Sequence, residues 1–382
     1  GKSTMINYIS SLFKDKQKIF LANTNPAVEN LRRKVTAEHA EFVTITKFLS
    51  KDVSNDCDIL CLDECSTISN RDMVRVLQRA QCKLLVLVGD IYQIESILFG
   101  NWFNIAYKVM PKDSVAELTR PHRTTVQGLI EVWNKVREIT EDRLEFITRN
   151  GLSSTLDESI FSRTEEDEIV LCLNYDGIYG INNINKFLQS NNVNPSINWG
   201  VLSYKVGDPV LFNESNRFAP LVYNNLKGKI LQIEEEEDCI YFTIEVYTVL
   251  NELDVIGFDL ELKESVTDET SVIRFKVGRG GDGNDDNDNV ENVVPFQVAY
   301  AISIHKAQGL EYESVKVVIT SEIEEMVSHN IFYTAITRAK SKLKIYWSPE
   351  TEKRILENMK VQFNDKDYQL FKAKYKEALL KS

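Results

Sequence analysis

The sequence predicts an α/β fold with parallel sheets, because apolar runs of strand length alternate with helix-like segments. Residues 59–62 are apolar or nearly so and run directly into Asp63 and Glu64. After a helix-like segment at 71–81, the mostly apolar run 83–88 ends in Gly89 and Asp90. Such runs are typical of strands buried in a parallel sheet, which binds ligands at the carboxyl ends of its strands.

Further strands are predicted at 18–22 and 42–46, and a second α/β region begins with an apolar run at 169–173. From residue 198 the pattern changes to short alternating segments between turns, which favours a small β-barrel. The α/β pattern returns after a Gly/Asp/Asn-rich loop at 278–292. We therefore expect a first domain at 1–120, a second formed by 121–197 and 293–382, and a β subdomain inserted at 198–292.

Length, charge and cysteine content limit the class of protein. At 382 residues the chain is longer than one ordinary domain, and 43% hydrophobic with 27% charged residues is typical of a globular protein. The net charge of −12 argues weakly against nucleic-acid binding over the whole surface, but two acidic runs carry much of it. Without a membrane-length apolar run or signal-peptide pattern, a cytoplasmic protein with reduced cysteines is expected.

The first four residues, GKST, precede a helical pattern and match the second half of a phosphate-binding loop. In such loops Lys reaches the β- and γ-phosphates and the hydroxyl binds Mg²⁺, so Lys2 and Ser3 fit these roles. The earlier glycines and the preceding strand are not in this sequence. We therefore expect the chain to start inside its own nucleotide site and assign ATP hydrolysis to a longer parent protein.

The acidic pair at the end of the 58–62 run fits phosphoryl-transfer chemistry. Asp63 would hold Mg²⁺ and Glu64 would orient a water, while Gln93 after the next strand would sense a γ-phosphate. An isolated Asp-Glu pair is more often an ordinary acidic loop. Two successive strands that both end in polar residues make the catalytic interpretation stronger. Thr24 and Asn25 could bind phosphate or ribose, or could simply cap a helix.

The ordered motifs resemble superfamily 1 helicases, and within them the RecD-like branch that moves 5′→3′. They cover nearly the whole chain and are GKST, TNPAVENL, TITKFL, CLDE, VGDIYQI, LTRPHR, SIHKAQGLE and YTAITRAK. Residues 205–208 and 222–228 also resemble the SH3-like subdomain of that branch. The resemblance implies two RecA-like P-loop NTPase motor domains with parallel sheets, and an SH3-like β-barrel inserted in the second.

The resemblance also implies ATP and Mg²⁺ as cofactors and assigns residues to them. The nucleotide residues are Gly1, Lys2, Ser3, Thr4, Asp63, Asp90, Gly309 and Glu311, with Ser3 and Asp63 as metal ligands. The catalytic residues are Glu64, Gln93 and two arginine fingers, Arg123 and Arg338. Fingers can supply about 10³–10⁵ in rate, and fingers on the opposite motor domain would make hydrolysis depend on closure of the cleft.

The resemblance implies single-stranded DNA, including single-strand/duplex junctions, as the nucleic-acid partner. It also implies a nuclease or repair protein as a partner, and roles in DNA repair and recombination. The expected contacts are Thr24, Asn25, Thr46, Lys47, His305 and Lys306, mostly with phosphates and sugars. Phe48, Tyr92 and Trp102 could stack on bases, but aromatic residues beside core strands are more often packed inside the protein.

Three alternatives remain open at this point. An RNA helicase of the same superfamily would use similar backbone contacts, and a binding module could keep the fold without hydrolysis. The third alternative is a nuclease, but the sequence contains no separate cluster of carboxylates that would support it. The link from Leu49 to Asp58 is too short for the β-hairpin that usually splits duplexes in this branch, so translocation is better supported than unwinding.

Overall fold

The computed structural model describes residues 2–50, 55–94, 101–118, 124–213, 217–219, 221–265, 267–279, 292–360 and 365–381. The chain divides into two compact units. Unit 1 comprises Gly1–Ser153, Ser321–Leu343 and Pro349–Ser382, and unit 2 comprises Ser154–Thr320 and Lys344–Ser348. These units group segments by their mutual contacts, and the motor-domain boundaries expected from the sequence stay a prediction.

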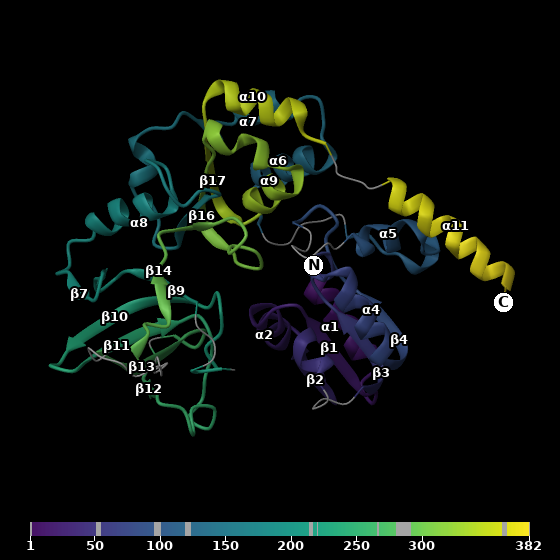
Figure 1. Cartoon of the computed structure of the whole chain (residues 1–382), viewed down its shortest axis with the longest axis horizontal. Helices are drawn as coiled ribbons and strands as arrows, with labels where there is room; N and C mark the ends of the chain where they lie inside the picture. Colours follow the sequence, from purple (N-terminus) through teal and green to yellow (C-terminus); the bar gives the residue numbers. More distant parts are fainter. Residues whose placement is uncertain are drawn as a thin grey trace, which may run out of the picture. The chain divides into compact units, whose positions relative to one another are not determined.

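A parallel four-stranded sheet forms the centre of unit 1, as the sequence predicts (Figure 1). Its strands, in the order β2-β1-β3-β4, are β2 (Ala40–Thr44), β1 (Lys18–Ala22), β3 (Asp56–Leu62) and β4 (Gln81–Leu87). The register pairs Ala22 with Thr44, Leu21 with Leu62, and Leu62 with Leu87. All four strands therefore reach their carboxyl ends at the same edge of the sheet.

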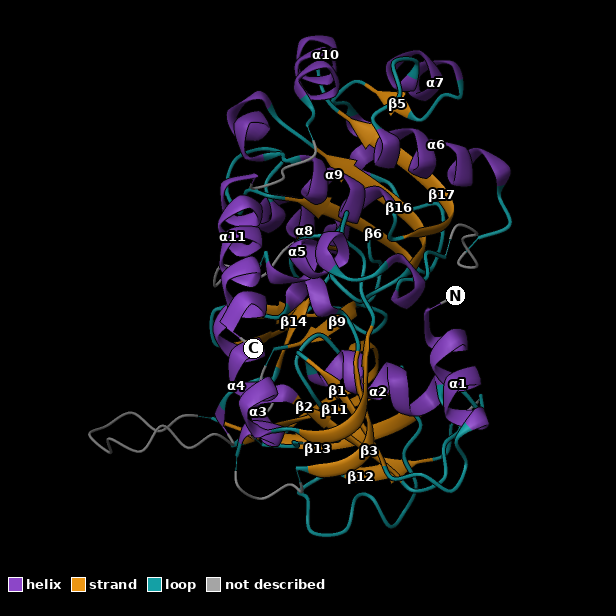
Figure 2. Cartoon of the chain, turned by 90° about the vertical axis from the view of Figure 1, so that its right-hand side faces the viewer, coloured by secondary structure: helices purple, strands orange, loops and turns teal. Residues whose placement is uncertain are grey.

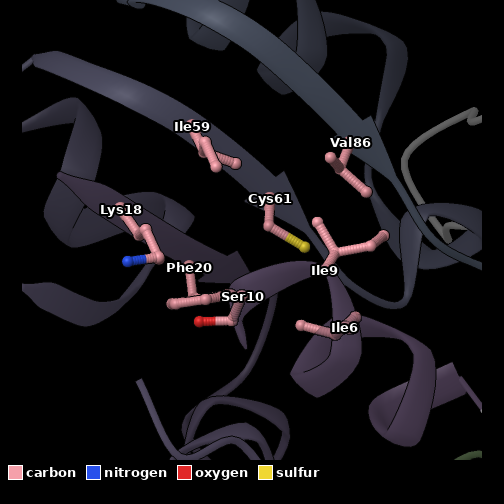
Figure 3. A pocket seen from close by; sticks show the side chains of 8 residues that line it. All are labelled: Ile6, Ile9, Ser10, Lys18, Phe20, Ile59, Cys61 and Val86. Carbon is pink, nitrogen blue, oxygen red and sulfur yellow. The ribbon is translucent and has the colours of Figure 1, made fainter. Parts of the chain in front are cut away.

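Side chains alternate between the two faces of this sheet and bury a core on each. Phe20 and Cys61 belong to a cluster with Ile6 of α1 (Lys2–Leu12) and Leu31 of α2 (Asn25–Lys34). Leu21 and Leu60 belong to the opposite cluster, which also contains residues of α3 (Ile45–Leu49) and α4 (Asn70–Arg79). Figure 3 shows a small pocket under α1, lined by Ile6, Ile9, Ser10, Lys18, Phe20, Ile59, Cys61 and Val86.

The predicted strand at 42–46 is wrong at its end. Strand β2 stops at Thr44, whose hydroxyl accepts a hydrogen bond from Lys47 N at 3.2 Å and caps α3. A threonine cap satisfies a backbone amide that has no partner within the helix, and this favours ending the strand there. Thr46 and Lys47 consequently lie on a short helix instead of at the end of a strand.

Unit 1 has further helices, among which α6 buries Leu129, Val132, Trp133 and Val136 and packs against α7 and α9. Trp133 Nε1 donates to Ile336 O at 3.0 Å, and His329 Nε2 lies 2.9 Å from Val136 O, so α6 contacts α9. These helices are α5 (Trp102–Val109), α6 (Gln127–Glu138), α7 (Arg143–Arg149), α9 (His329–Ile336), α10 (Pro349–Asn358) and α11 (Asp365–Lys381).

A second sheet has the order β15-β6-β16-β17-β5, and β6 pairs in parallel with both of its neighbours (Figure 2). Its strands are β5 (Ser153–Ser154), β6 (Glu168–Cys172), β15 (Ala301–Ser303), β16 (Tyr312–Val318) and β17 (Ala339–Tyr346). Helix α8 (Ile181–Ser190) packs on it through Ile184 and Leu188. This confirms an α/β fold with parallel sheets.

Unit 2 also contains a six-stranded antiparallel sheet with a core rich in phenylalanine. Its strands, in the order β12-β13-β11-β10-β9-β14, are β12 (Glu261–Lys263), β13 (Ser271–Gly278), β11 (Cys239–Val246), β10 (Lys227–Glu235), β9 (Pro209–Phe212) and β14 (Phe296–Val298). A separate pair joins β7 (Ile197–Trp199) to β8 (Leu202–Tyr204). Closure into an SH3-like barrel stays a prediction.

Two details of this sheet differ from the sequence prediction. The alternating pattern that begins at residue 198 predicts a strand over 256–262, but only β12 forms there, because a turn with Gly257 at φ +89° occupies most of that range. Residues 296–298, expected in the second motor domain, pair with β9 as strand β14. The antiparallel sheet therefore includes a strand that follows the Gly/Asp/Asn-rich residues 278–292 in the sequence.

Among the described residues, every helix falls short of the length and apolarity that crossing a bilayer requires. The six cysteines are free thiols, as the sequence predicts.

Candidate functional site

The candidate site lies at the carboxyl edge of the sheet in unit 1. Strand β3 leads into Asp63 and Glu64, and β4 leads to Asp90 two residues after Val88. Because the four strands are parallel and in register, the polar residues after them gather at one edge. The sequence predicted this edge from the two apolar runs, and the observed sheet order places their strands side by side.

Lys2 and Glu64 contact each other across this edge. Lys2 Nζ donates to Glu64 Oε1 at 3.2 Å, and both side chains are about one-quarter exposed, at 27% and 22%. Burial by itself lowers the pKa of the Lys2 ammonium. The nearby carboxylates of Glu64, Asp63 and Asp90 outweigh this effect and raise the pKa of Lys2 above its ordinary value. A stable positive charge therefore lies among three acids.

Glu64 has a left-handed backbone, with φ 51° and ψ 41°, at the start of the 3₁₀ helix Cys65–Thr67. This conformation is uncommon for residues with a side chain and is often found at functional sites. Neighbouring contacts hold it in place: Thr67 N donates to Glu64 O at 2.9 Å, and Asn23 Nδ2 donates to Thr67 O at 2.9 Å. The turn aims Glu64 back toward Lys2.

Asp63 is buried, with 7% of its surface exposed, and its Oδ1 has no hydrogen-bond partner among the described residues. Burial and then the Glu64 carboxylate raise the pKa of Asp63 to about 6. A buried carboxylate oxygen without a donor is suited to a cation, and Mg²⁺ proteins commonly supply only one or two such ligands. Ser3, in the first turn of α1, is half-buried.

The loop after β4 is organised by Asp90. Its Oδ1 accepts from Tyr92 N at 3.0 Å, and its Oδ2 accepts from Gln93 Nε2 at 3.3 Å. Gln93 is buried, with 6% exposed. Asp90 thus fixes the side-chain amide that the sequence analysis assigned to γ-phosphate sensing.

Two residues of α9 that the sequence analysis missed hold the same loop. Asn330 Nδ2 donates to Gln93 O at 2.9 Å, and Thr334 Oγ1 accepts from Ile94 N at 3.0 Å. Both lie in unit 1 and are four residues apart, on one side of the helix. Their polar character within the largely apolar segment HNIFYTAI was the available signal.

Arg338, the residue expected to be a finger, follows α9 and is almost fully buried at 1% exposed. Its Nε donates to Thr334 O at 2.9 Å and its Nη2 donates to Thr337 Oγ1 at 3.2 Å. The same α9 therefore contacts the Gln93 loop and orients Arg338. Gly1 and Arg123 lie outside the described residues.

The expected nucleic-acid residues of unit 1 lie after β1 and β2. Thr24, Asn25, Thr46 and Lys47 are all exposed, as is Thr4 in α1. Thr24 Oγ1 accepts from Ala27 N at 3.4 Å, so it caps α2 as the alternative interpretation has it. The helix cap leaves the exposed side of this segment accessible.

The other expected contacts lie in unit 2, in the loop between β15 and β16. His305 is exposed, whereas Lys306 is half-buried and donates to Gln297 Oε1 at 2.9 Å. Gly309 has φ +81°, and Glu311 is the residue immediately before β16. The structure groups these four residues in one loop.

The three aromatic residues considered for base stacking pack within unit 1. Phe48 is fully buried beneath Arg79, and Trp102 Nε1 donates to Ile68 O at 2.8 Å. Tyr92 packs edge-on against His329 and Tyr333, with ring centroids 6.1 Å away in both cases. The structural interpretation therefore accounts for all three.

Two protein families match separate parts of the chain. Residues 1–157 match the AAA domain family, and residues 298–346 match the UvrD-like helicase C-terminal domain family. The RecBCD enzyme subunit RecD of Mycolicibacterium smegmatis is 22% identical over 336 residues, which cover 80% of this chain and 52% of that protein. The chain is thus similar to RecD-like superfamily 1 helicases.

Solved structures of Pif1 helicases have a fold similar to that of this chain. The Pif1 helicase of Candida albicans matches with a TM-score of 0.55 at 18% identity, covering 99% of this chain and 93% of that one. A Pif1 helicase from Bacteroides in complex with ADP-AlF3 and ssDNA matches with a TM-score of 0.53 at 16% identity, covering 99% and 91%. The chain spans 35% to 52% of the length of three curated relatives.

Proposed function

We propose that this helicase-family chain is an ATP-driven motor that moves along single-stranded DNA, in the 5′→3′ direction. One observation carries the proposal. At the carboxyl edge of a parallel sheet, the Lys2 ammonium contacts Glu64, beside the buried Asp63 whose Oδ1 has no hydrogen-bond partner among the described residues. These groups match what phosphoryl transfer requires, namely a cation that binds phosphate, a carboxylate that binds the metal and a second carboxylate that orients the attacking water.

Each group of this edge has one role in the proposal. Lys2 binds the β- and γ-phosphates, and its ammonium stays charged because the surrounding carboxylates raise its pKa. Glu64, released from Lys2 by the bound phosphates, accepts a proton from the attacking water. Gln93, held by Asp90, donates to the γ-phosphate.

Asp63 and Ser3 would hold Mg²⁺, which when bound neutralises phosphate charge. The residues present fit this ion, because Asp63 offers a buried oxygen without a donor. Thr4, Asp90, Gly309 and Glu311 complete the proposed nucleotide contacts. Arg338, and Arg123 from outside the described residues, would supply the finger charges.

Single-stranded DNA would contact the loops that follow the strands. Thr24, Asn25, Thr46 and Lys47 are exposed at the edge that carries the acids, and His305 is exposed in its own loop. Contacts of hydroxyl, amide and ammonium groups with phosphates follow a strand without reading its sequence. The Bacteroides Pif1 structure holds ssDNA and ADP-AlF3 on the same fold, which supports nucleotide and DNA as ligands.

The deciding experiment measures ATP hydrolysis by the full-length protein with and without oligo-dT. We expect stimulation by the oligonucleotide, and loss of more than 100-fold in kcat for Glu64→Gln. The matched control is Glu29→Gln, because within the described parts of the chain Glu29 on α2 forms ion pairs only with arginines of its own helix. Unstimulated or absent hydrolysis by the wild-type protein, with oligonucleotide binding retained, would instead establish a non-hydrolysing binding module.

A second measurement separates DNA from RNA as the track. Hydrolysis is compared at equal concentrations of oligo-dT and oligo-U, and we expect stronger stimulation by oligo-dT. A strong preference for oligo-U would establish the RNA helicase instead. Direction is then read from the release of streptavidin from biotin at the 3′ or 5′ end, and faster release from the 3′ end supports 5′→3′ movement.

A further inference from the structure

Lys227 connects the antiparallel sheet of unit 2 to the segment that begins β16. It is the first residue of β10, and only 17% of its side chain is exposed. Its Nζ lies 2.6 Å from Asp167 Oδ1 and donates to Glu311 O at 3.2 Å. The same ammonium lies 4.1 Å from the ring centroid of Tyr312 and 5.0 Å from that of Tyr247.

Asp167 extends this connection to the residues after Glu311. Its Oδ2 accepts from Glu313 N at 3.2 Å, and its carbonyl accepts from Ser314 N at 3.2 Å. The Lys227–Asp167 pair therefore fixes four successive residues, 311–314. An ammonium suits this place because it offers three donors and also binds aromatic faces.

The other end of the same loop is also tied to the antiparallel sheet. Lys306 Nζ donates to Gln297 Oε1 in β14, and β14 and β10 both pair with β9. The 304–311 loop, which carries His305 and Gly309, is thus held at both ends by strands of one sheet. A shift of β10 or β14 would move the loop.

We propose that Lys227 is a positioning residue through which the antiparallel sheet sets the geometry of the 304–311 loop, and so links strand binding to nucleotide binding. This inference rests on the proposed function, which assigns His305 and Lys306 of that loop to the DNA strand and Gly309 and Glu311 to the nucleotide. Lys227 itself touches neither ligand. It acts through the Glu311 carbonyl and through Asp167.

The chain offers a matched control two residues away. Lys229 lies on the same strand and pairs with Glu166, the neighbour of Asp167, but this pair is more exposed and, within the described residues, makes no contact with the 304–311 loop. Lys227→Met removes the charge and keeps most of the side-chain volume, and Lys229→Met does the same at the control site. Asp167→Asn and Glu166→Gln repeat the comparison from the acidic side if Lys227→Met fails to fold.

The first readout is hydrogen exchange of peptides that cover 304–314. We expect exchange at least 10-fold faster in Lys227→Met than in wild type, little change in Lys229→Met, and partial recovery in Lys227→Arg. Equal exchange in the two methionine variants would overturn the inference, because the loop would then not depend on this ammonium. This readout needs no activity.

The second readout is the oligo-dT concentration that gives half-maximal ATP hydrolysis. For Lys227→Met we expect it to rise about 10-fold relative to Lys229→Met, with less than a twofold change in kcat at saturating oligo-dT. If the wild type is active and both methionine variants need the same oligo-dT concentration for half-maximal hydrolysis, the coupling between strand binding and nucleotide binding is overturned, and the proposed function is not. A wild type without strand-stimulated hydrolysis would overturn the proposed function and this coupling with it.

Discussion

The amide of Ile94 donates to the hydroxyl of Thr334 at 3.0 Å, across 240 residues of sequence. The carbonyl of Thr334 in turn accepts from Arg338 Nε at 2.9 Å. One residue of α9 therefore contacts both the loop of the proposed γ-phosphate sensor and the proposed finger. A displacement of that loop would therefore change the position of Arg338 through these two hydrogen bonds.

We expect Thr334→Val to lower ATP hydrolysis more than it lowers stability. Valine keeps the shape of threonine and removes the acceptor of the Ile94 amide, which should cost about 1–3 kcal/mol in the free energy of unfolding. Because the Gln93 loop then loses a fixed position, kcat should fall about 10-fold or more. Urea unfolding and steady-state hydrolysis measure the two effects.

Ser328→Ala is the control for this prediction. Ser328 caps the same helix through Ile331 N and makes no contact with the Gln93 loop in the described part of the chain. Loss of a cap costs about 1 kcal/mol. If both variants lose kcat equally at similar stability, the Thr334 hydroxyl has no specific role.

The left-handed backbone of Glu64 predicts an unusual order of stabilities. Glu64→Ala and Glu64→Gly both remove the contact with Lys2, but only glycine adopts φ near 51° without a steric penalty. We expect Glu64→Gly to unfold with a free energy about 1 kcal/mol higher than Glu64→Ala. The reverse order, in urea or thermal unfolding, would mean that the turn relaxes when the side chain is removed.

The pKa of Asp63 predicts how stability depends on pH in the absence of Mg²⁺ and nucleotide. Burial raises this pKa from 3.8 to about 6, so the folded protein binds the proton more tightly than the unfolded chain does. The contribution of Asp63 to stability is complete below pH 3.8 and is lost as pH rises through 6. The stability of Asp63→Asn should therefore rise relative to wild type between pH 4 and pH 6.5.

Asp58 should give the opposite sign. A hydrogen bond from Lys83 lowers the pKa of the Asp58 carboxyl, so its contribution is present above the ordinary pKa and is lost as pH falls. The stability of wild type relative to Asp58→Asn should rise with pH. Parallel slopes for both variants, in unfolding measured with EDTA, would contradict the assigned cause of the Asp63 shift.

Sequence patterns predicted the sheet edge well because they depend on local chemistry. An apolar run followed by polar residues identifies the end of a buried strand without knowledge of its neighbours, and this placed Asp63, Glu64 and Asp90 together. The lysine of the short GKST segment was linked to Glu64 only by resemblance. The structure adds the 3.2 Å contact between them.

Contacts between distant segments could not be predicted in the same way. Thr334 and Asn330 looked like polar residues of an ordinary helix, and their partners lie more than 230 residues away. The Thr44 cap was missed because a β-branched residue fits a strand and a helix cap equally well. Lys227 lies in the 222–228 segment that carries part of the resemblance, but its positioning role could not be predicted there, since it depends on Asp167 and on the Glu311 backbone.

Asp208 provides the last prediction, because it joins the antiparallel sheet to α8 and to the segment before β15. This fully buried carboxylate accepts from Gln189 Nε2 at 2.6 Å, Asn192 Nδ2 at 2.8 Å and Tyr300 Oη at 2.8 Å. Removing it leaves the buried Tyr300 hydroxyl and the half-buried amides of Gln189 and Asn192 without this acceptor, so Asp208→Ala should lower the free energy of unfolding by about 3–5 kcal/mol. Asp208→Asn keeps one acceptor oxygen and should lose less. Asp254→Ala, in an exposed turn, is the control, and equal losses in urea unfolding would show that this network contributes little to stability.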